Sequence, residues 1–352
     1  MFKIIAFAVF ALFSSITLAS SLEVGSWNMM RLGNGDQKNY AALAEVASKF
    51  DIFAVQEVMT QQGIDQLKSA LQRKTGESWD SISSHQVGRH SYKEMYAFVW
   101  RKSAVSAEDG GVVYLDRSDT FEREPFSAQF KNNSTGQTFA LSTVHIIYGK
   151  SEAVRTPEIT KLRDYWTWLH EIYPGVPVIL MGDFNMNPTE QAWGPLKEVA
   201  KPLLTSGAST LSIKDGKFSN LYDNFWVDKQ ATLALSNYGI VQYPAMIGWS
   251  HEQSRQQVSD HAPIHVTMGQ GTRSTSASPQ AALTPPVRAS TAKSQQVASN
   301  TPTADVRGNQ NSKIYHLPGC KSYSSISPKN IVHFSSEQSA QQAGYRIAGN
   351  CQ

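Results

Sequence analysis

Cysteine is scarce in this sequence: only two of the 352 residues are cysteines, Cys320 and Cys351, and both lie near the C-terminus. Disulfides therefore cannot hold the rest of the chain together, and apolar side chains must form its core. Long apolar runs are scarce as well. Beyond the first residues no stretch approaches the roughly 20 apolar residues of a membrane-spanning helix, so we expect no membrane insertion.

Residues 1–19 have the composition of an export signal. Lys3 supplies a positive charge, Ile4–Phe13 are almost wholly apolar, and the segment ends at Ala19 with a small residue of the kind found before a cleavage site. This pattern predicts a mature protein that is secreted or periplasmic.

Net charge is also small, at +3, but it is unevenly distributed. From Gln270 onward there are eight Lys or Arg and two acidic residues, whereas residues 20–269 carry 23 basic and 27 acidic residues. A nucleic-acid partner would be attracted by the basic tail or by local basic patches. The alternative is that the basic tail serves only solubility.

Composition divides the chain after the signal into three parts. Residues 20–269 contain the regularly spaced apolar residues of a large domain. Residues 270–310 are rich in Ser, Thr, Ala, Gln and Pro and have few large apolar side chains, which predicts a disordered linker. Apolar residues return in residues 311–352, which we expect to form a small module.

Apolar periodicity in residues 20–269 predicts a mixed α/β (α+β) domain in which the first strands and helices alternate. The predicted strands are 22–27, 51–55, 79–84, 95–101, 125–130, 137–145, 178–181, 221–227 and 262–268, and the predicted helices are 37–49, 62–74, 160–173 and 190–199. Gly182 follows one buried strand and lets the backbone turn where Asp183 and Asn185 emerge.

Polar side chains recur at the ends of these strands. They are Asn28, Glu57, His145, Asp183, Asn185, Asp223, Asp260 and His261. Any one of them could be an ordinary surface or turn residue. Because each lies next to a buried apolar strand, the set together indicates a cleft that combines metal ligands with imidazoles.

The chemistry of these residues points to phosphate esters. The side chains of Asn28, Glu57, Asp183, Asn185 and Asp260 offer hard oxygen donors, which suit Mg²⁺ and also Mn²⁺ or Ca²⁺. Such an ion neutralises charge on a phosphoryl group, and histidine is suited to acid–base work near neutral pH. The residues therefore predict metal-assisted hydrolysis of a phosphate ester.

Four motifs carry a family resemblance. Trp27-Asn28, Gln56-Glu57, Gly182-Asp183-Phe184-Asn185 and Ser259-Asp260-His261, in this order, resemble the endonuclease/exonuclease/phosphatase superfamily over residues 22–268. The resemblance implies a four-layer αββα sandwich with the active site at one edge of two packed sheets. The segment Gly88–Tyr96 closely resembles the part of the deoxyribonuclease I family that supplies an active-site Tyr and Glu.

The resemblance also implies roles. Glu57 would hold the metal, with Asn28, Asp183, Asn185 and Asp260 around the metal or the phosphate. His145 would pair with Glu94 and His261 with Asp223, one histidine activating water and the other protonating the departing 3′ oxygen. Tyr92 would contact DNA. The implied protein is a monomer that cleaves DNA with little sequence specificity and leaves 5′-phosphate ends.

The sequence departs from that family in its DNA-contacting residues. Met59 stands in place of a groove-contacting arginine, and a second family arginine falls on Met30, with Arg31 one position late. Residues 108–122 do not reproduce the family's calcium loop, so we expect no obligatory structural calcium there. We expect Arg31, Arg89 and Lys150 to bind substrate, Lys150 replacing a missing phosphate contact.

The C-terminal module resembles the small zinc-binding domain of the Ada DNA-repair protein, on Tyr315–Cys320 and the segment that ends at Cys351. His316, Cys320 and Cys351 match three of its four zinc ligands, but Ala348 stands where the remaining cysteine should be. A disulfide between the two cysteines is the favoured interpretation, and zinc is the alternative. DNA binding and attachment to a cell-surface polymer are both open roles.

Two other readings of the large domain stay open from sequence. One is a phosphatase or a sphingomyelinase-type phosphodiesterase of the same superfamily, against which the Gly88–Tyr96 segment argues. The other is a DNA-binding protein that kept the fold and lost turnover. The metal count and the preference among double-stranded DNA, single-stranded DNA and RNA also stay open.

Overall fold

The computed structural model describes residues 21–35, 37–230, 233–269, 306–318, 320, 323, 330–334, 337–348 and 351. The chain forms two compact units, Met1–Pro286 and Val287–Gln352, which we call the first unit and the C-terminal unit. The predicted signal (1–19) and most of the predicted linker lie outside the described residues. No helix in the described part of the chain is long and apolar enough to cross a membrane.

Two mixed sheets form the centre of the first unit. The first sheet has the order β12-β13-β1-β2-β4-β3, and the second has the order β10-β11-β9-β8-β7-β5, with β6 also paired to β7. The strands of the first sheet are β1 Leu22–Leu32, β2 Ile52–Val58, β3 Trp79–Ser83, β4 Met95–Arg101, β12 Leu235–Ile240 and β13 Ile264–Met268. Those of the second are β5 Val105–Ala107, β6 Val112–Val113, β7 Phe126–Asn132, β8 Thr138–His145, β9 Val178–Asp183, β10 Ala200–Pro202 and β11 Asp223–Asp228.

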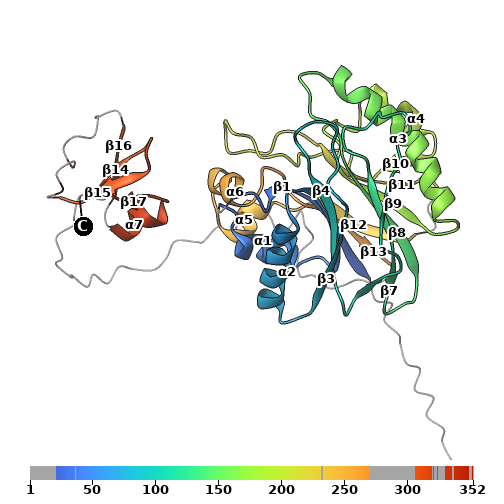
Figure 1. Cartoon of the computed structure of the whole chain (residues 1–352), viewed down its shortest axis with the longest axis horizontal. Helices are drawn as coiled ribbons and strands as arrows, with labels where there is room; N and C mark the ends of the chain where they lie inside the picture. The colour runs from blue at the N-terminus through green and yellow to red at the C-terminus, as the bar shows by residue number, and fades with distance from the viewer. Residues whose placement is uncertain are drawn as a thin grey trace, which may run out of the picture. The chain divides into compact units, whose positions relative to one another are not determined.

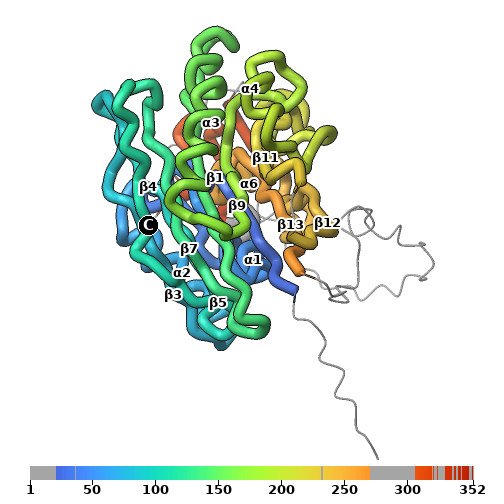
Figure 2. Tube along the Cα trace, turned by 90° about the vertical axis from the view of Figure 1, so that its right-hand side faces the viewer, coloured from blue at the N-terminus to red at the C-terminus, as the bar shows by residue number. Residues whose placement is uncertain are grey.

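Helices cover the outer face of each sheet (Figure 1). Helices α1 (Tyr40–Ala47) and α2 (Gln61–Thr75) lie on the first sheet, and α3 (Glu152–Ile172), the short turn η1 (Gln191–Trp193) and α4 (Gly194–Lys197) lie on the second. Figure 2, turned so that the α3 side faces the viewer, shows α3 and α4 in front of the second sheet. Helices α5 (Tyr243–Ile247) and α6 (His251–Gln257) precede β13. The predicted αββα sandwich is confirmed.

Three apolar clusters hold these layers together. One, which includes Phe98 and Phe130, fills the space between the two sheets. A second packs α1 and α2 onto the first sheet, and a third packs α3 onto the second sheet and contains the stacked rings of Trp193 and Trp226, 4.4 Å apart. Burying each large apolar side chain stabilises the fold by about 1.5–3 kcal/mol. Both sheets are thus fixed on two faces, which makes their shared edge a rigid platform.

The structure moves the ends of several predicted elements and adds short ones. The predicted helix 37–49 shortens to α1, and the predicted helix 190–199 is replaced by η1 and the single turn α4. Helix α3 begins at Glu152, not at residue 160, and contains Pro157. Proline removes only one helical hydrogen bond near the start of a helix, and the packing of Ile159, Leu162 and Trp166 outweighs that loss. Strands β5, β6, β10 and β12 and helices α5 and α6 were not predicted. The strands β5, β6 and β10 and helix α5 are too short for a clear period, and β12 and α6 have no buried apolar face.

The C-terminal unit is a four-stranded sheet of order β16-β14-β15-β17. Its strands are β14 Val306–Asn309, β15 Ile314–His316, β16 Ile331–Phe334 and β17 Arg346–Ile347, and α7 (Glu337–Gln342) packs against it. Strand β14 overlaps the end of the predicted linker, so that prediction ran too far. Val306 begins β14 because its side chain is buried with Tyr315 and Tyr345.

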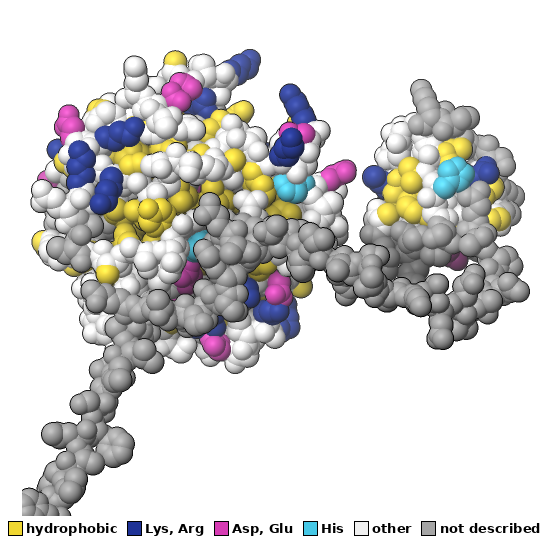
Figure 3. All heavy atoms as spheres, turned by 180° about the vertical axis from the view of Figure 1, so that it is seen from behind, with side chains coloured by type: hydrophobic (Ala, Val, Ile, Leu, Met, Phe, Trp, Pro, Cys, Tyr) yellow, Lys and Arg dark blue, Asp and Glu magenta, His cyan; other side chains and the backbone are white. Residues whose placement is uncertain are grey.

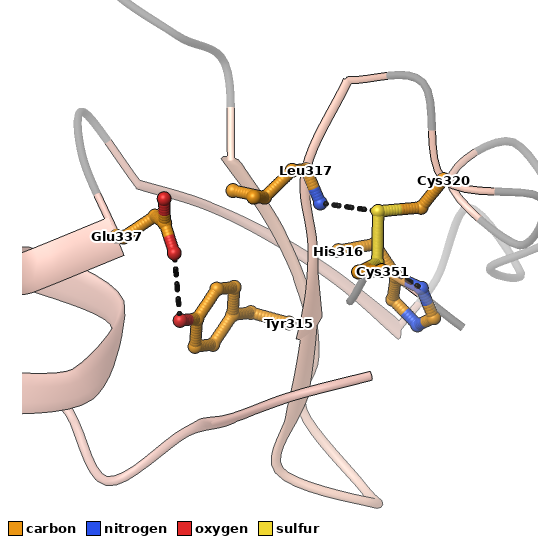
Figure 4. The surroundings of a disulfide bond; sticks show 6 residues. All are labelled: Tyr315, His316, Leu317, Cys320, Glu337 and Cys351. Atoms are coloured by element: carbon orange, nitrogen blue, oxygen red, sulfur yellow. Dashed lines mark hydrogen bonds between the residues drawn. A yellow bond between two sulfur atoms is a disulfide. The ribbon is translucent and has the colours of Figure 1, made fainter. Parts of the chain in front are cut away.

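Cys320 and Cys351 form a disulfide in this unit, with sulfurs 2.01 Å apart (Figure 4). The imidazole Nδ1 of His316 lies 3.9 Å from the Cys351 sulfur. Glu337 of α7 accepts a hydrogen bond from the Tyr315 hydroxyl at 3.0 Å. The structure therefore has the disulfide that the sequence favoured, and the two sulfurs are not arranged as separate zinc ligands.

Candidate active site

The predicted strand-end residues meet at one edge of the sandwich. In the second sheet His145, Asp183 and Asp223 are direct register partners on the neighbouring strands β8, β9 and β11. Asn28 of β1 and Glu57 of β2 come from the first sheet, and the Asn28 amide nitrogen crosses to Asp183 at 3.1 Å. Glu57, His145 and Asp183 border a cleft of about 1300 Å³, so both sheets contribute to its floor, while Asn28 and Asp223 are fully buried.

His145 is fixed by a buried carboxylate. Its Nδ1 lies 2.8 Å from Glu94 Oε1, and its backbone N–H donates to the Tyr96 hydroxyl at 2.9 Å. Glu94 is fully buried, with the Arg123 Nε 3.6 Å from the same oxygen. Burial alone would lower the pKa of His145, but the Glu94 carboxylate raises it above its ordinary value. The pairing with Glu94 thus turns Nε2 of the ring toward the cleft.

His261, which lies just before β13, repeats this arrangement. Its Nδ1 lies 2.8 Å from Asp223 Oδ2, and Asp223 is fully buried. Burial opposes the charged ring, yet the carboxylates of Asp223 and Asp183 hold the pKa of His261 well above its ordinary value. Each histidine therefore has its own buried carboxylate on Nδ1, which fixes the ring and supports a positive charge on it.

Asp183 lies between the two imidazoles. Its Oδ2 is 3.6 Å from His145 Nε2 and 3.4 Å from His261 Nε2. Burial would raise the pKa of this carboxyl group, but His261 and then His145 hold it below the ordinary value. Two rings that can each carry a proton thus face one carboxylate, so that a substrate placed there would have an acid and a base on its two sides.

Asn28 and Glu57 are adjacent, but Asn28 does not present the oxygen that was predicted for a metal. Its amide nitrogen donates to Glu57 Oε1 at 3.0 Å as well as to Asp183, while its Oδ1 accepts the Met30 N–H at 2.9 Å. Asn28 therefore orients two carboxylates, and its fully buried amide oxygen is bonded to the backbone next to it. Glu57 is half-buried and also accepts the Arg31 N–H at 3.0 Å.

Asn185 and Asp260 also differ from their predicted roles. The Asn185 side chain donates to the Ile146 carbonyl at 2.9 Å, and its backbone N–H donates to Asp183 Oδ1 at 2.9 Å, so Asn185 positions the loop and Asp183. Asp260 borders the cleft, but its Oδ2 lies 3.2 Å from Arg255 Nη2. A cation at Asp260 would have to compete with this guanidinium.

Of the predicted DNA-contacting residues, Tyr92 and Arg31 border the cleft together. The Arg31 guanidinium lies 5.7 Å from the centre of the Tyr92 ring, and the Tyr92 hydroxyl is 3.4 Å from Glu57 Oε2. Burial raises the pKa of Tyr92, so the phenol stays neutral near pH 7. The two side chains form a mixed cationic and aromatic wall next to the carboxylates.

Arg89 and Lys150 were also predicted to bind substrate, and the structure does not bring either to the cleft. Arg89 is held by Glu122, 3.3 Å from its Nε, and donates to the Asp119 carbonyl at 2.8 Å. Lys150 is exposed in the loop after β8 and does not line the cleft. The Glu122 carboxylate is buried and needs a partner of opposite charge, and this pairing holds Arg89 in place.

Several cleft residues escaped the sequence analysis, among them Lys38, Arg123, Tyr148, Tyr222 and Arg255. Lys38 donates to the Val258 carbonyl at 2.7 Å, and burial lowers its pKa to about 8 although Asp260 and Glu57 act in the opposite direction. Lys38 lies in a loop before α1, where no periodic pattern marks a functional side chain. Only its position in the fold identifies it.

Backbone strain is concentrated at the site. Met30, Arg31, Glu57 and Asn185 all have positive φ, at 43°, 56°, 57° and 48°. Such conformations are unfavourable for residues other than glycine and persist only where the surrounding structure enforces them. Four of the seven non-glycine residues with positive φ in the described part of the chain thus lie at or beside Asn28, Glu57 and Asp183.

Gly182 has the conformation that a side chain would obstruct, as the sequence suggested. Its φ is +140°, and an added Cβ would lie 2.1 Å from the Val144 carbonyl oxygen on β8. We expect Gly182→Ala to lower the free energy of unfolding by about 3 kcal/mol or more, measured by urea denaturation. Gly175→Ala is the matched control, because Gly175 also has positive φ (+73°) but nothing within 4 Å of the added atom. Equal losses in the two variants would contradict this explanation.

The donor set fits a hard divalent cation. Asp183, Asp223 and His261 form a buried group whose ligand atoms lie within 4.8 Å of one another. Asp223 is already hydrogen-bonded to His261 Nδ1, however, so this pair serves to fix the ring. Glu57 and Asp183 remain as candidate metal ligands. Both carboxylates border the cleft, and both accept hydrogen bonds from the Asn28 amide nitrogen. Carboxylate oxygens are the ligands that Mg²⁺ uses.

The sandwich and these paired imidazoles define a hydrolase of phosphate esters. The model of the endonuclease/exonuclease/phosphatase family matches residues 25–197. A deoxyribonuclease from Thioalkalivibrio sp. (strain K90mix) is 44% identical over 271 residues, covering 74% of this chain and 75% of the relative. Deoxyribonuclease-1 of Oryctolagus cuniculus is 27% identical over 275 residues, covering 72% of this chain and 94% of the relative.

The chain therefore belongs to the endonuclease/exonuclease/phosphatase family. The solved structure of a mannosyl-6-phosphatase from Bacteroides thetaiotaomicron VPI-5482 shares the fold, with a TM-score of 0.51, 19% identity and coverage of 70% of this chain and 99% of that one. A second family model, ArfC, matches residues 284–347. The resemblance of this region to the Ada domain thus stays a prediction.

Proposed function

We propose that this protein is an exported, Mg²⁺-dependent endonuclease that hydrolyses DNA phosphodiester bonds with little sequence specificity. The observation that carries the proposal is the pair of carboxylate-fixed imidazoles that face Asp183, at 3.6 and 3.4 Å. Similarity to proteins named deoxyribonuclease over about three quarters of the chain supports DNA as the substrate class.

In the proposed reaction His145 and His261 divide the proton transfers. One imidazole takes a proton from the attacking water as the new P–O bond forms, and the other gives a proton to the 3′ oxygen as the old P–O bond breaks. The products are a 5′-phosphate and a 3′-hydroxyl. Glu94 and Asp223 keep each ring in the tautomer that its task requires. A bound Mg²⁺, held by Glu57 and Asp183, would supply neutralisation of the phosphoryl charge.

The test is cleavage of supercoiled plasmid by the purified protein with Mg²⁺, next to a lipid phosphodiester and a phosphomonoester. We expect nicking and then linearisation of the plasmid, little turnover of the other two substrates, and loss of cleavage in EDTA. Turnover of the lipid or the monoester with intact plasmid would assign the protein to another branch of the family. Plasmid binding without turnover of any substrate would favour a protein that has lost catalysis.

The pH dependence tests the role of Asp223. This carboxylate raises the pKa of His261, so its neutralisation in Asp223→Asn lets the ring lose its proton at a lower pH. We expect the limb of the pH profile of kcat/KM that reports His261 to move to lower pH. Asp228→Asn is the control, because Asp228 pairs with His170 at the far end of β11. An unmoved limb in Asp223→Asn would show that His261 does not titrate in the reaction.

The proposal also includes export of the protein and a monomeric state. The C-terminal unit would serve either in DNA binding or in attachment to a cell-surface polymer. The Cys320–Cys351 disulfide is consistent with an oxidising compartment, where small units are commonly cross-linked. Mature protein recovered from the medium or periplasm should begin at Ser20, which N-terminal sequencing checks. An intact N-terminus on protein confined to the cytoplasm would refute export.

A further inference from the structure

The segment Leu211–Phe218, between β10 and β11, is a small hairpin that we call the cleft hairpin. Leu211 and Phe218 form a bridge at its base, and the Ser212 N–H donates to the Lys217 carbonyl at 2.8 Å. Gly216, with φ +66°, and Asp215, which accepts the Lys217 N–H at 3.2 Å, close the turn. The chain therefore turns back within a few residues and presents a narrow tip.

The base of the cleft hairpin is joined to the active site. The Leu211 N–H donates to the Asp260 carbonyl at 2.7 Å, and Thr210 bridges to His261. Arg255 of α6 donates to the Leu211 carbonyl at 2.6 Å. In Figure 1 the segment between β10 and β11 reaches toward α6, away from the second sheet. The hairpin is thus held at a defined position relative to the catalytic His261.

The tip combines an exposed apolar residue with basic ones. Ile213 is 74% exposed and borders the cleft, as does the neighbouring Lys214, while Lys217 is exposed on the returning strand. On the face drawn in Figure 3, basic side chains are interspersed with acidic ones, as the nearly balanced charge of the first unit implies. Covering the exposed Ile213 side chain with a substrate would be favourable, because it removes apolar surface from water.

We propose that the cleft hairpin contacts duplex DNA, with Ile213 inserted in a groove and Lys214 on a phosphate. This rests on the proposed nuclease function. Isolated apolar wedges next to lysine or arginine are a recurrent way of entering the minor groove, and lysine pairs with the phosphates on its rim. One apolar side chain beside Lys214, Asp215 and Lys217 is too little apolar surface to enter a lipid bilayer.

The hairpin would position the duplex relative to the active site. Because its base is bonded to Asp260 and bridged to His261 through Thr210, a duplex that rests on Ile213 is held in register with the acid–base pair. A single strand, which has no groove, gains little from the wedge. The hairpin thus favours duplex over single-stranded substrates and takes no part in bond breaking.

The experiment compares Ile213→Ser and Lys214→Ala with two control variants. Leu115→Ser removes an apolar residue of similar exposure (70%) that does not line the cleft, and Lys229→Ala removes an exposed lysine that does not line it either. Each protein is assayed for kcat/KM on a duplex oligonucleotide, a single strand and bis(4-nitrophenyl) phosphate. Binding of the duplex is measured separately by fluorescence anisotropy in EDTA, where cleavage does not contribute.

We expect Ile213→Ser to lower kcat/KM on the duplex about tenfold, and at least fivefold more than on the small diester. Lys214→Ala should reduce the slope of log binding constant against log salt by about 1. Both controls should match the wild type. Equal losses on duplex and small diester would reveal a structural role and overturn the inference. Unchanged duplex cleavage and binding would overturn it as well.

These outcomes separate the two proposals. If the wild type cleaves no DNA but Ile213→Ser weakens duplex binding, the nuclease assignment fails and the hairpin contact stands. If the wild type cleaves DNA and Ile213→Ser binds and cleaves like it, only the hairpin contact fails. A wild type that neither binds nor cleaves duplex DNA would refute both.

Discussion

Replacing Asp183 with asparagine should lower the rate of plasmid nicking by about 10³-fold, which corresponds to roughly 4 kcal/mol of transition-state stabilisation. The reason lies in its three partners: both imidazole Nε2 atoms and the Asn28 amide nitrogen converge on the same Oδ2. The variant neutralises the charge that all of them contact, and it removes a carboxylate proposed for Mg²⁺. Initial nicking rates at saturating Mg²⁺ measure the effect.

Asp228→Asn serves as the matched control for Asp183→Asn. Asp228 is also an acidic residue of the second sheet with a histidine partner, but it lies with His170 outside the cleft. We expect this control to retain full activity, and circular dichroism should show both variants folded. If Asp183→Asn kept more than a tenth of the wild-type rate while folded, the nicking reaction would not depend on the Asp183 carboxylate as proposed.

Histidine substitutions should show that His145 and His261 act as one unit. His145→Ala and His261→Ala should each lower kcat about 10²–10⁴-fold, as expected on loss of a general acid or base. The double variant should be no more than a few times slower than the slower single variant, because either loss already disables the concerted proton transfers. Single-turnover cleavage of a labelled duplex provides the rates.

His170→Ala is the control for that series, because its ring pairs with Asp228 away from the cleft. If the losses in the double variant multiplied, His145 and His261 would act in separate steps or at separate sites. Unchanged activity in one single variant would leave water or another residue as the acid or base on that side.

Much of the site could be predicted because it follows from sheet geometry. Polar residues that follow buried strands were expected at one edge, and the parallel pairing of β8 with β9 and of β1 with β2 places His145 and Asp183, and Asn28 and Glu57, there. The glycine before Asp183 was read correctly as a backbone requirement. These predictions need only strand direction and the alternation of side chains.

The remaining features depend on contacts between distant segments. The orientation of the Asn28 amide is set by Glu57, Asp183 and the Met30 N–H, none of which a local pattern reveals. Lys38 faces the cleft because the loop before α1 folds toward Val258, and Arg89 is withdrawn because Glu122 is buried. Tertiary contacts of this kind decide where a long side chain points.

Because the site is divided between two sheets, its activity depends on how the sheets pack against each other. His145, Asp183 and Asp223 move with the second sheet, whereas Asn28 and Glu57 move with the first. A slight slide of one sheet over the other would separate the Asn28 amide from Asp183 while every backbone ladder stayed intact. Activity should therefore disappear under mild destabilisation before secondary structure does, and a substrate that spans the seam would hold the two sheets in place.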